Sequence, residues 1–292
     1  MDVIAKKRKY IVMNSSAKKD RRIRYALVVI TGLYCLLTFA PLYFVIINSF
    51  KSNSAIIANP FILHPKEFTF DSFTSAYNLL KFPVAFKNSS LLLIISLSMV
   101  VTSGSLAGFS IATARSKFLN FYLGVLIALQ TLPFLLGMVP SVVQLKYLGL
   151  QNNIIGTSLI LAAFSLPFTI FLYTGYMRSL PQELYEAAVV DGCSFIQSYL
   201  YVYMPLLKAV TGTVIILQGV GIWNDFLISY VTLGTAKNLP LIPRLFAFSS
   251  GRTTRYDLLF AGTFLVSIPI VIIFLAFQKV FVDGIVAGSV KG

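Results

Sequence analysis

Acidic side chains are rare in this chain of 292 residues, and one of them lies where a carboxylate is costly. Asp225 is the only acidic residue well inside a long apolar stretch. An ionised group in such a place must face water or a partner. It can therefore accept hydrogen bonds from a polar solute in a cavity, or it can serve helix packing, and the sequence leaves both open. The side chains that can join it at a solute pathway, or act only as contacts between helices, are those of Trp223, Asn224, Gln218 and Gln130.

Motifs for catalysis and metal binding are missing from the sequence. It contains no phosphate-binding loop, no nucleophile elbow and no paired His/Glu metal motif. The only histidine, His64, has no other His or Cys nearby to complete a metal site. We therefore expect a protein that is not an enzyme, that binds no metal or cofactor and that does not itself hydrolyse ATP.

Composition and the spacing of charges indicate a membrane protein. Only 12% of the residues are charged, against roughly 25% in a soluble domain, and mean hydropathy is +0.81. Uncharged stretches long enough to cross a bilayer, which takes about 20 residues, recur along the chain. The sequence predicts an all-α polytopic membrane protein in which a membrane domain, 25–283, contains six spanning helices. We expect these at about 25–47, 88–112, 119–143, 154–177, 206–233 and 257–280.

The basic residues are concentrated at the N-terminus and predict the orientation. Residues 1–24 hold nine Lys and Arg and two Asp, and so supply half of the formal net charge of +14. With six spans, 15 Lys and Arg would face the side that holds the N-terminus and nine the other side. We expect both termini, including a tail at 284–292, in the cytoplasm. A nucleic-acid-binding function is the alternative for the basic arm, but no recognition module accompanies it.

The cytoplasmic loop at 178–205 has the clearest local signals. Ser179 and Gln182 have the spacing of a capping box, which predicts a helix from Leu180 to Val190. Gly192 suits the left-handed turn that ends a helix. Ser194 and Gln197 repeat the capping spacing and predict a second short helix. A helix of about ten residues is only marginally stable alone in water, so we expect it to dock against a partner.

The same loop resembles the EAA motif of binding-protein-dependent ABC importer permeases. Glu186, Ala187 and Ala188 are followed by Gly192 and then by Val202-Tyr203-Met204-Pro205 at the spacing of that family. Only Val202 and Met204 depart from the family pattern, and both stay apolar. The resemblance implies the type I ABC importer permease fold, in which this segment is the coupling helix that sits in a groove of a cytoplasmic ATP-binding subunit. The coupling residues it implies are Glu183, Glu186, Ala187, Ala188, Asp191 and Gly192.

Two further stretches resemble the carbohydrate-uptake branch, and the six-span maltose-type permease in particular. They are Trp223–Leu227 and the tail Val286–Gly292. The resemblance implies import of a carbohydrate, expected to be an oligosaccharide, across a bacterial cell membrane. It also implies a second homologous permease, two ATP-binding subunits that bind ATP and Mg, and an extracellular solute-binding protein, with Ser289 and Lys291 touching the ATP-binding subunits. The alternative is a carrier driven by an ion gradient, which would show more intramembrane charges and internal repeats.

Overall fold

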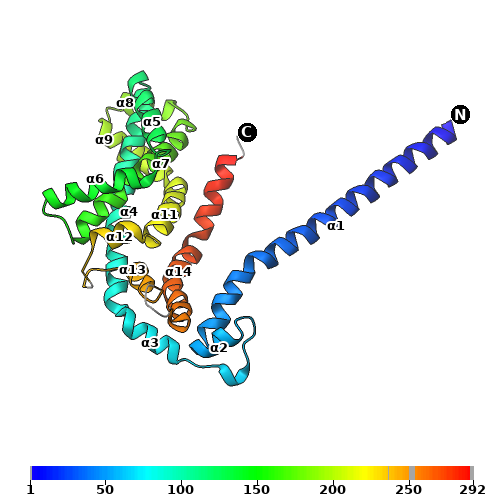
Figure 1. The fold of residues 1–292 in the computed structure, drawn as a ribbon. Coiled ribbons are helices and arrows are strands. Elements are labelled where there is room, and N and C mark those ends of the chain that lie inside the picture. Colours follow the sequence, from blue (N-terminus) through cyan, green and yellow to red (C-terminus); the bar gives the residue numbers. More distant parts are fainter. Residues whose placement is uncertain (1, 236, 250–253, 290–292) are drawn as a thin grey trace.

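The computed structural model describes residues 2–235, 237–249 and 254–289, and all regular structure in these ranges is helical (Figure 1). Four long helices dominate: α1 (Asp2–Ser49), α4 (Phe82–Ala114), α7 (Ile154–Arg178) and α14 (Tyr256–Ser289). Each contains an apolar stretch that is long enough to cross a membrane. The predicted all-α polytopic class is confirmed.

The number of spans depends on two bent pairs of helices. α5 (Lys117–Leu129) and α6 (Phe134–Tyr147) meet at 101°, at a connection that contains Pro133. Proline lacks an amide hydrogen and restricts the residue before it, so a helix cannot continue straight through such a position easily. The second pair, Phe195–Leu206 and α11 (Lys208–Trp223), meets at 78°. The described residues contain four helices long and apolar enough to span a membrane, or up to six spans if each bent pair counts as one, so six stays a prediction.

The predicted fifth span, 206–233, differs from the structure. α11 ends at Trp223, and a separate helix, α12 (Leu227–Thr232), follows after a break of three residues. Asp225 in this break accepts hydrogen bonds from the amides of Ile228 and Ser229. A carboxylate that binds the free amides of a helix start favours a new helix over continuation of the old one.

α4 packs along α7 because two glycines let the backbones approach. Gly104 and Gly108 lie one turn apart on α4, and a Cβ atom at Gly108 would lie 2.7 Å from the Cβ of Tyr173 on α7. A Cβ at Gly104 would lie 2.5 Å from the γ-methyl of Thr169. Small residues four apart serve this purpose in membrane helices, where close packing replaces the hydrophobic effect. The α4–α7 pair is the frame to which the other helices attach.

The buried apolar residues form two main clusters at the two ends of α4. The first contains Leu80, Ala85, Leu92 and Leu93 together with Trp223, Leu241 and Val266. The second contains Val100 and Phe109 together with Tyr173, Tyr199, Tyr203 and Val214. Each cluster joins residues from several helices, so both ends of the bundle have a packed core.

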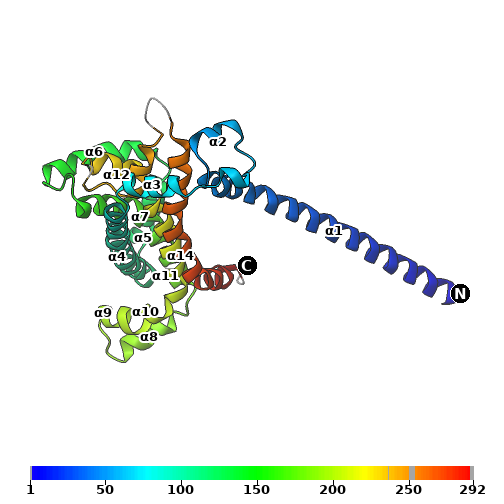
Figure 2. The same cartoon turned by 90° about the horizontal axis from the view of Figure 1, so that it is seen from below.

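Short helices lie at the two opposite ends of the molecule (Figures 1 and 2). One end holds α2 (Asn53–Ala58), the short helix η1 (Pro65–Glu67), α3 (Asp71–Leu80) and α13 (Leu241–Phe246). The other holds α8 (Glu183–Val190), α9 (Phe195–Gln197), the π-helix η2 (Ser198–Tyr203) and α10 (Met204–Leu206). The loop that resembles the EAA motif therefore lies far from the segment around α2 and α3.

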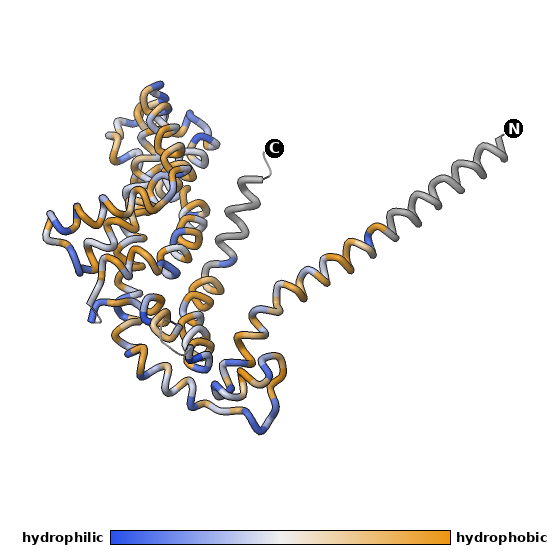
Figure 3. The backbone as a smooth tube through the Cα atoms, viewed as in Figure 1, coloured by the Kyte–Doolittle hydropathy of each residue, from blue (hydrophilic) through white to orange (hydrophobic). Residues whose placement is uncertain are grey.

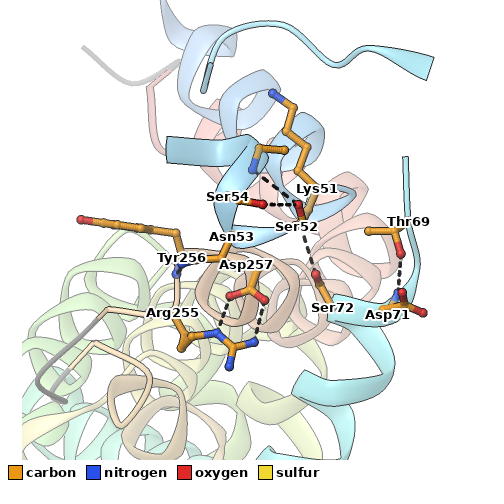
Figure 4. Close-up of polar contacts among 11 residues, drawn as sticks. Lys51, Ser52, Asn53, Ser54, Thr69, Asp71, Ser72, Arg255, Tyr256 and Asp257 are labelled. Carbon is orange, nitrogen blue, oxygen red and sulfur yellow. Dashed lines mark hydrogen bonds and ion pairs between the residues drawn. The ribbon is translucent and has the colours of Figure 1, made fainter. Parts of the chain in front are cut away.

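Polar contacts hold the α2–α3 end together, as Figure 4 shows. The Ser72 hydroxyl donates to the carbonyl oxygen of Lys51 (3.1 Å), and the Tyr256 amide donates to Asn53 Oδ1 (3.0 Å). Arg255 forms an ion pair with Asp257 at 2.8 Å. The buried Lys51 ammonium donates to the carbonyl of Asn59 (2.7 Å), and burial lowers the pKa of this lysine. These contacts fasten the start of α14 to the segment after α1.

α1 projects away from the rest of the molecule (Figures 1 and 3). Its apolar side chains between Ile23 and Leu42 are exposed, and only its last turn, with Ile47, Asn48 and Ser49, is buried. The Ser49 hydroxyl donates to the carbonyl of Phe260 in α14 (3.0 Å). A helix that is apolar and exposed on all sides suits a lipid or protein environment. The basic arm is the N-terminal part of the α1 helix, and its side chains up to Arg22 lie outside the described residues.

Candidate coupling site

The predicted coupling helix is present, but it begins later than the sequence suggested. α8 starts at Glu183 instead of Leu180. The amides of Ser179 and Leu180 donate to the carbonyls of Tyr176 and Met177, so these two residues complete the last turn of α7. The side-chain Nε2 of Gln182 donates a hydrogen bond forward to Glu186 Oε1 (2.7 Å), not back toward Ser179. The predicted capping box at Ser179 is therefore wrong, because α7 uses the residues that would have formed it.

The predicted end of the helix is confirmed. Gly192 has φ +82°, the left-handed conformation that glycine adopts without strain. Its amide donates to the carbonyl of Val189 (3.0 Å), and the amide of Cys193 donates to the carbonyl of Ala188 (2.9 Å). This pair of bonds is the Schellman motif, which satisfies the last carbonyls of a helix. The helix α8 therefore ends in a hydrogen-bonded left-handed turn at Gly192.

The second predicted capping box is also confirmed. The Ser194 amide donates to Gln197 Oε1 (2.8 Å), and the Gln197 amide donates to the Ser194 hydroxyl (3.4 Å). The box starts α9, and the helix continues through η2 and α10 up to the bend before α11. The loop after α8 is thus a rigid connection to α11.

The outward face of α8 is apolar at positions where a solvent-facing helix is normally polar. Ala188 is buried, but Val190 is 86% exposed and Val189 is 51% exposed. Glu183, Glu186, Ala187, Asp191 and Gly192 are also exposed. All six predicted coupling residues therefore lie on one short helix and its turn, and five of them are open to a partner. Exposed valines beside carboxylates suit a protein interface better than contact with water.

A cluster of aromatic rings joins α8 to the membrane helices. Phe109 on α4 is fully buried, and its ring lies 4.8 Å from that of Phe195 and 5.5 Å from that of Tyr199. The rings of Tyr203 and Tyr185 lie 4.8 Å and 5.9 Å from it. Such packing, worth about 0.5 to 1.5 kcal/mol per ring pair beyond burial, fastens α8, α9 and η2 to α4.

The buried hydroxyls of Ser105 and Tyr199 add a hydrogen bond of 2.6 Å between α4 and η2. Sequence reasoning missed this cluster of rings. The aromatic residues at 195, 199 and 203 recur every four positions, which is the one signal in the sequence that points to an aromatic face.

The residues predicted for a solute pathway do not form one group. Trp223 is buried in the core, and its indole Nε1 donates to the carbonyl of Val266 (3.3 Å). Asp225 is half-buried, and one of its oxygens accepts from the amide (2.8 Å) and hydroxyl (2.7 Å) of Ser229. Asn224 is exposed in the same break, and Gln218 is half-buried on α11. Asp225 thus caps α12 with its carboxylate.

Gln130 lies elsewhere, at the bend between α5 and α6. It lines a cavity of about 590 Å³, whose other walls come from the same bend and from α7. These walls are largely apolar and consist of Leu129, Leu132, Pro133, Phe134, Leu136, Gly137, Ala163, Phe164 and Pro167. The prolines of two neighbouring elements, Pro133 at the bend and Pro167 within α7, thus line the same cavity.

The predicted C-terminal contacts fall at the limit of the structure. Ser289 ends α14, but its side chain lies outside the described residues, and so does Lys291 as a whole.

The sequence matches proteins of known transport systems. A family model described as binding-protein-dependent transport system inner membrane component matches residues 100–286. The chain is 28% identical to the melibiose/raffinose/stachyose import permease protein MelC of Bacillus subtilis, over 96% of this chain and all of that protein. It is 31% identical to the multiple sugar-binding transport system permease protein MsmG of Streptococcus mutans, over 94% of this chain and all of that protein.

A solved structure supports the same fold. It is a bacterial ABC transporter involved in the import of the acidic polysaccharide alginate, and one of its chains superposes with a TM-score of 0.74 at 20% identity. The match covers 89% of this chain and 97% of that chain. The bundle described above is therefore the fold of an ABC importer permease.

Proposed function

Because the chain belongs to the family of binding-protein-dependent transport system inner membrane components, we propose that it imports a carbohydrate as the permease subunit of an ATP-driven transporter. The family and the long apolar helices make it an integral membrane protein. Its named relatives transport oligosaccharides or several sugars. They are permeases of import systems, and they give no support to a carrier driven by an ion gradient. The expected substrate is an oligosaccharide.

The observation that carries the proposal is the exposed face of α8. Val190, Glu186 and Ala187 are presented on a short helix that the Phe109 cluster fastens to α4. A partner that pulls or pushes α8 would move α4, and α7 with it, because Gly104 and Gly108 pack directly on α7. Two ATP-binding subunits, which bind ATP and Mg, would close when ATP binds. Their closure would in this way change which side of the membrane has access to the solute pathway.

The remaining partners complete the proposal. They are a second homologous permease, an extracellular binding protein that delivers the solute, and the lipid bilayer. Both termini would lie in the cytoplasm, on the same side as α8. For the solute pathway we propose the exposed Asn224 and the half-buried Gln218 on one side and the exposed Gln130 at the α5–α6 bend on another. Asp225 and Trp223 hold the surrounding helices in place through the bonds described above.

The test is sugar uptake and ATPase activity stimulated by the binding protein, in cells and vesicles that contain the complete transporter. Glu186→Lys reverses a charge on the exposed face of α8 and should abolish both activities while the protein stays in the membrane. Lys146→Glu reverses a charge at an exposed position of α6 that has no assigned role, and both activities should be kept. Normal uptake by the Glu186→Lys variant would contradict the proposal.

A further inference from the structure

A second cavity, separate from the outward face of α8, lies between the ends of four helices. It has a volume of about 360 Å³ and is bounded by the end of α4, the start of α5, the end of α7 and the start of α8. Two arginines line it, Arg115 and Arg178. Its other lining residues are Ala112, Thr113, Asn120, Met177, Leu180, Gln182, Tyr185 and Tyr203.

The positive charge of this cavity is not neutralised by any side chain that the structure describes. Arg178 donates a hydrogen bond to Asn120 Oδ1, which is a neutral acceptor. In the part of the chain that the structure describes, the one ion pair is that of Arg255 with Asp257, so no carboxylate lies within 4 Å of either guanidinium. The carboxylate of Glu186 accepts a hydrogen bond from the side chain of Gln182, which lines the cavity. Two guanidinium groups thus line one cavity, and no described carboxylate forms an ion pair with either of them.

The backbone at Arg115 supports a role for this side chain. Arg115 ends α4 with φ +47°, a left-handed conformation that helix ends normally give to glycine or asparagine. A residue with a long side chain held in this conformation is a reason to look for function. The left-handed turn places Arg115 at the entrance to α5, where it lines the cavity together with Asn120.

The surroundings indicate what kind of anion fits. α4 and α7 are apolar spanning helices, and the cavity lies where both end, which is the level of lipid headgroups. Directly beside Asn120, the rings of Phe118 and Phe121 on α5 are 72% and 71% exposed. Exposed aromatic rings next to a basic cavity at a membrane surface suit a molecule with a phosphate head and apolar chains.

We propose that Arg115 and Arg178 bind a phosphate group, and that its source is an anionic phospholipid whose chains lie along the exposed face of α5. Arginine is suited to this because its planar guanidinium donates two parallel hydrogen bonds to phosphate oxygens. A bound lipid at this place contacts α4, α5, α7 and α8 at once. It therefore ties the coupling helix to the membrane independently of the ATP-binding subunit.

The test is native mass spectrometry of the full chain, purified in detergent with the subunits that stay bound. Phosphatidylglycerol, phosphatidylcholine or inorganic phosphate is added. The wild type should retain phosphatidylglycerol in preference to phosphatidylcholine. The double variant Arg115→Gln/Arg178→Gln should retain at least about tenfold less of it, because charge-assisted bonds are lost. Lys146→Gln, which removes an exposed charge on α6, should bind like the wild type.

The other outcomes separate the sources. Inorganic phosphate that raises the unfolding temperature of the wild type and not of the double variant, without a preference for phosphatidylglycerol, would assign the site to a soluble phosphate compound. Equal lipid retention by all variants would overturn the proposal. It would also be overturned if the double variant kept its lipid and lost a protein subunit instead. If the double variant does not fold, Arg115→Lys/Arg178→Lys keeps the charges and should retain lipid at an intermediate level.

Discussion

The carboxylates of α8 and of the α11–α12 connection have opposite surroundings. Asp225 accepts hydrogen bonds on both oxygens from its own chain, at Ile228 and Ser229. Glu186 is exposed, and among the described residues its carboxylate is bonded to the side chain of Gln182, one turn away. An acid in an apolar stretch thus starts a helix, whereas the acids on a short surface helix are exposed, as the proposed contact with an ATP-binding subunit requires. The small number of acidic residues in the sequence does not by itself distinguish these two roles.

The largest effect should come from the contact that holds α8 in place. Phe109→Ala removes a fully buried ring that touches four aromatic neighbours, and should cost about 3 to 5 kcal/mol of stability. We expect a lower thermal unfolding temperature in detergent and loss of transport. Phe171→Ala, at a ring that is 45% exposed on α7, should have a much smaller effect. Equal effects of the two changes would contradict the anchoring role of the cluster.

The next effect tests the internal use of Asp225. Asp225→Ala leaves the buried hydroxyl and amide of Ser229 without their acceptor, which should cost about 2 kcal/mol. The unfolding temperature should fall, and Asp225→Asn should give an intermediate value. If instead sugar specificity changes and the unfolding temperature does not, Asp225 contacts the solute.

A smaller effect is expected at the turn after α8. Gly192→Ala should cost about 1 to 2 kcal/mol, because the positive φ disfavours any side chain although the space beside Gly192 is open. Gly175→Ala in α7 is the matched control, since it also meets open space but has no positive φ. It should be neutral or stabilising. Thermal unfolding of both variants side by side checks this, and equal values would argue against the left-handed turn.

The smallest effect concerns the cap of α9. Ser194→Ala removes the hydroxyl that accepts from the Gln197 amide and should cost about 1 kcal/mol. The loss should appear as faster hydrogen exchange at the amides of α9. Ser98→Ala on α4, where an exposed hydroxyl donates to the carbonyl of Ile94 within the helix, should leave exchange at α9 unchanged. Unchanged exchange in the Ser194→Ala variant would show that the cap is not needed to hold α9.

Local sequence signals were sufficient to predict α8 and its turn, whereas the contacts between helices could not be predicted from the sequence. Gly192 and Ser194 act on amides within a few residues, so their spacing was sufficient. The start of α8 was misplaced because the end of α7 competes for Ser179 and Leu180. Hydropathy carries no information on direction, so it could not predict the 101° bend between α5 and α6. The partners of Phe109 come from segments that are up to 94 residues away in the chain and meet only in the folded protein.

The most direct test of α8 as the coupling surface is the amount of ATP-binding subunit that co-purifies with this chain in detergent. Val190→Asp changes the most exposed apolar residue of α8 without touching a buried contact, whereas Asp225→Ala changes a cap in the α11–α12 connection. We predict that Val190→Asp loses the ATP-binding subunit and that Asp225→Ala retains it. Full retention by Val190→Asp would contradict the assignment of α8 as the coupling surface.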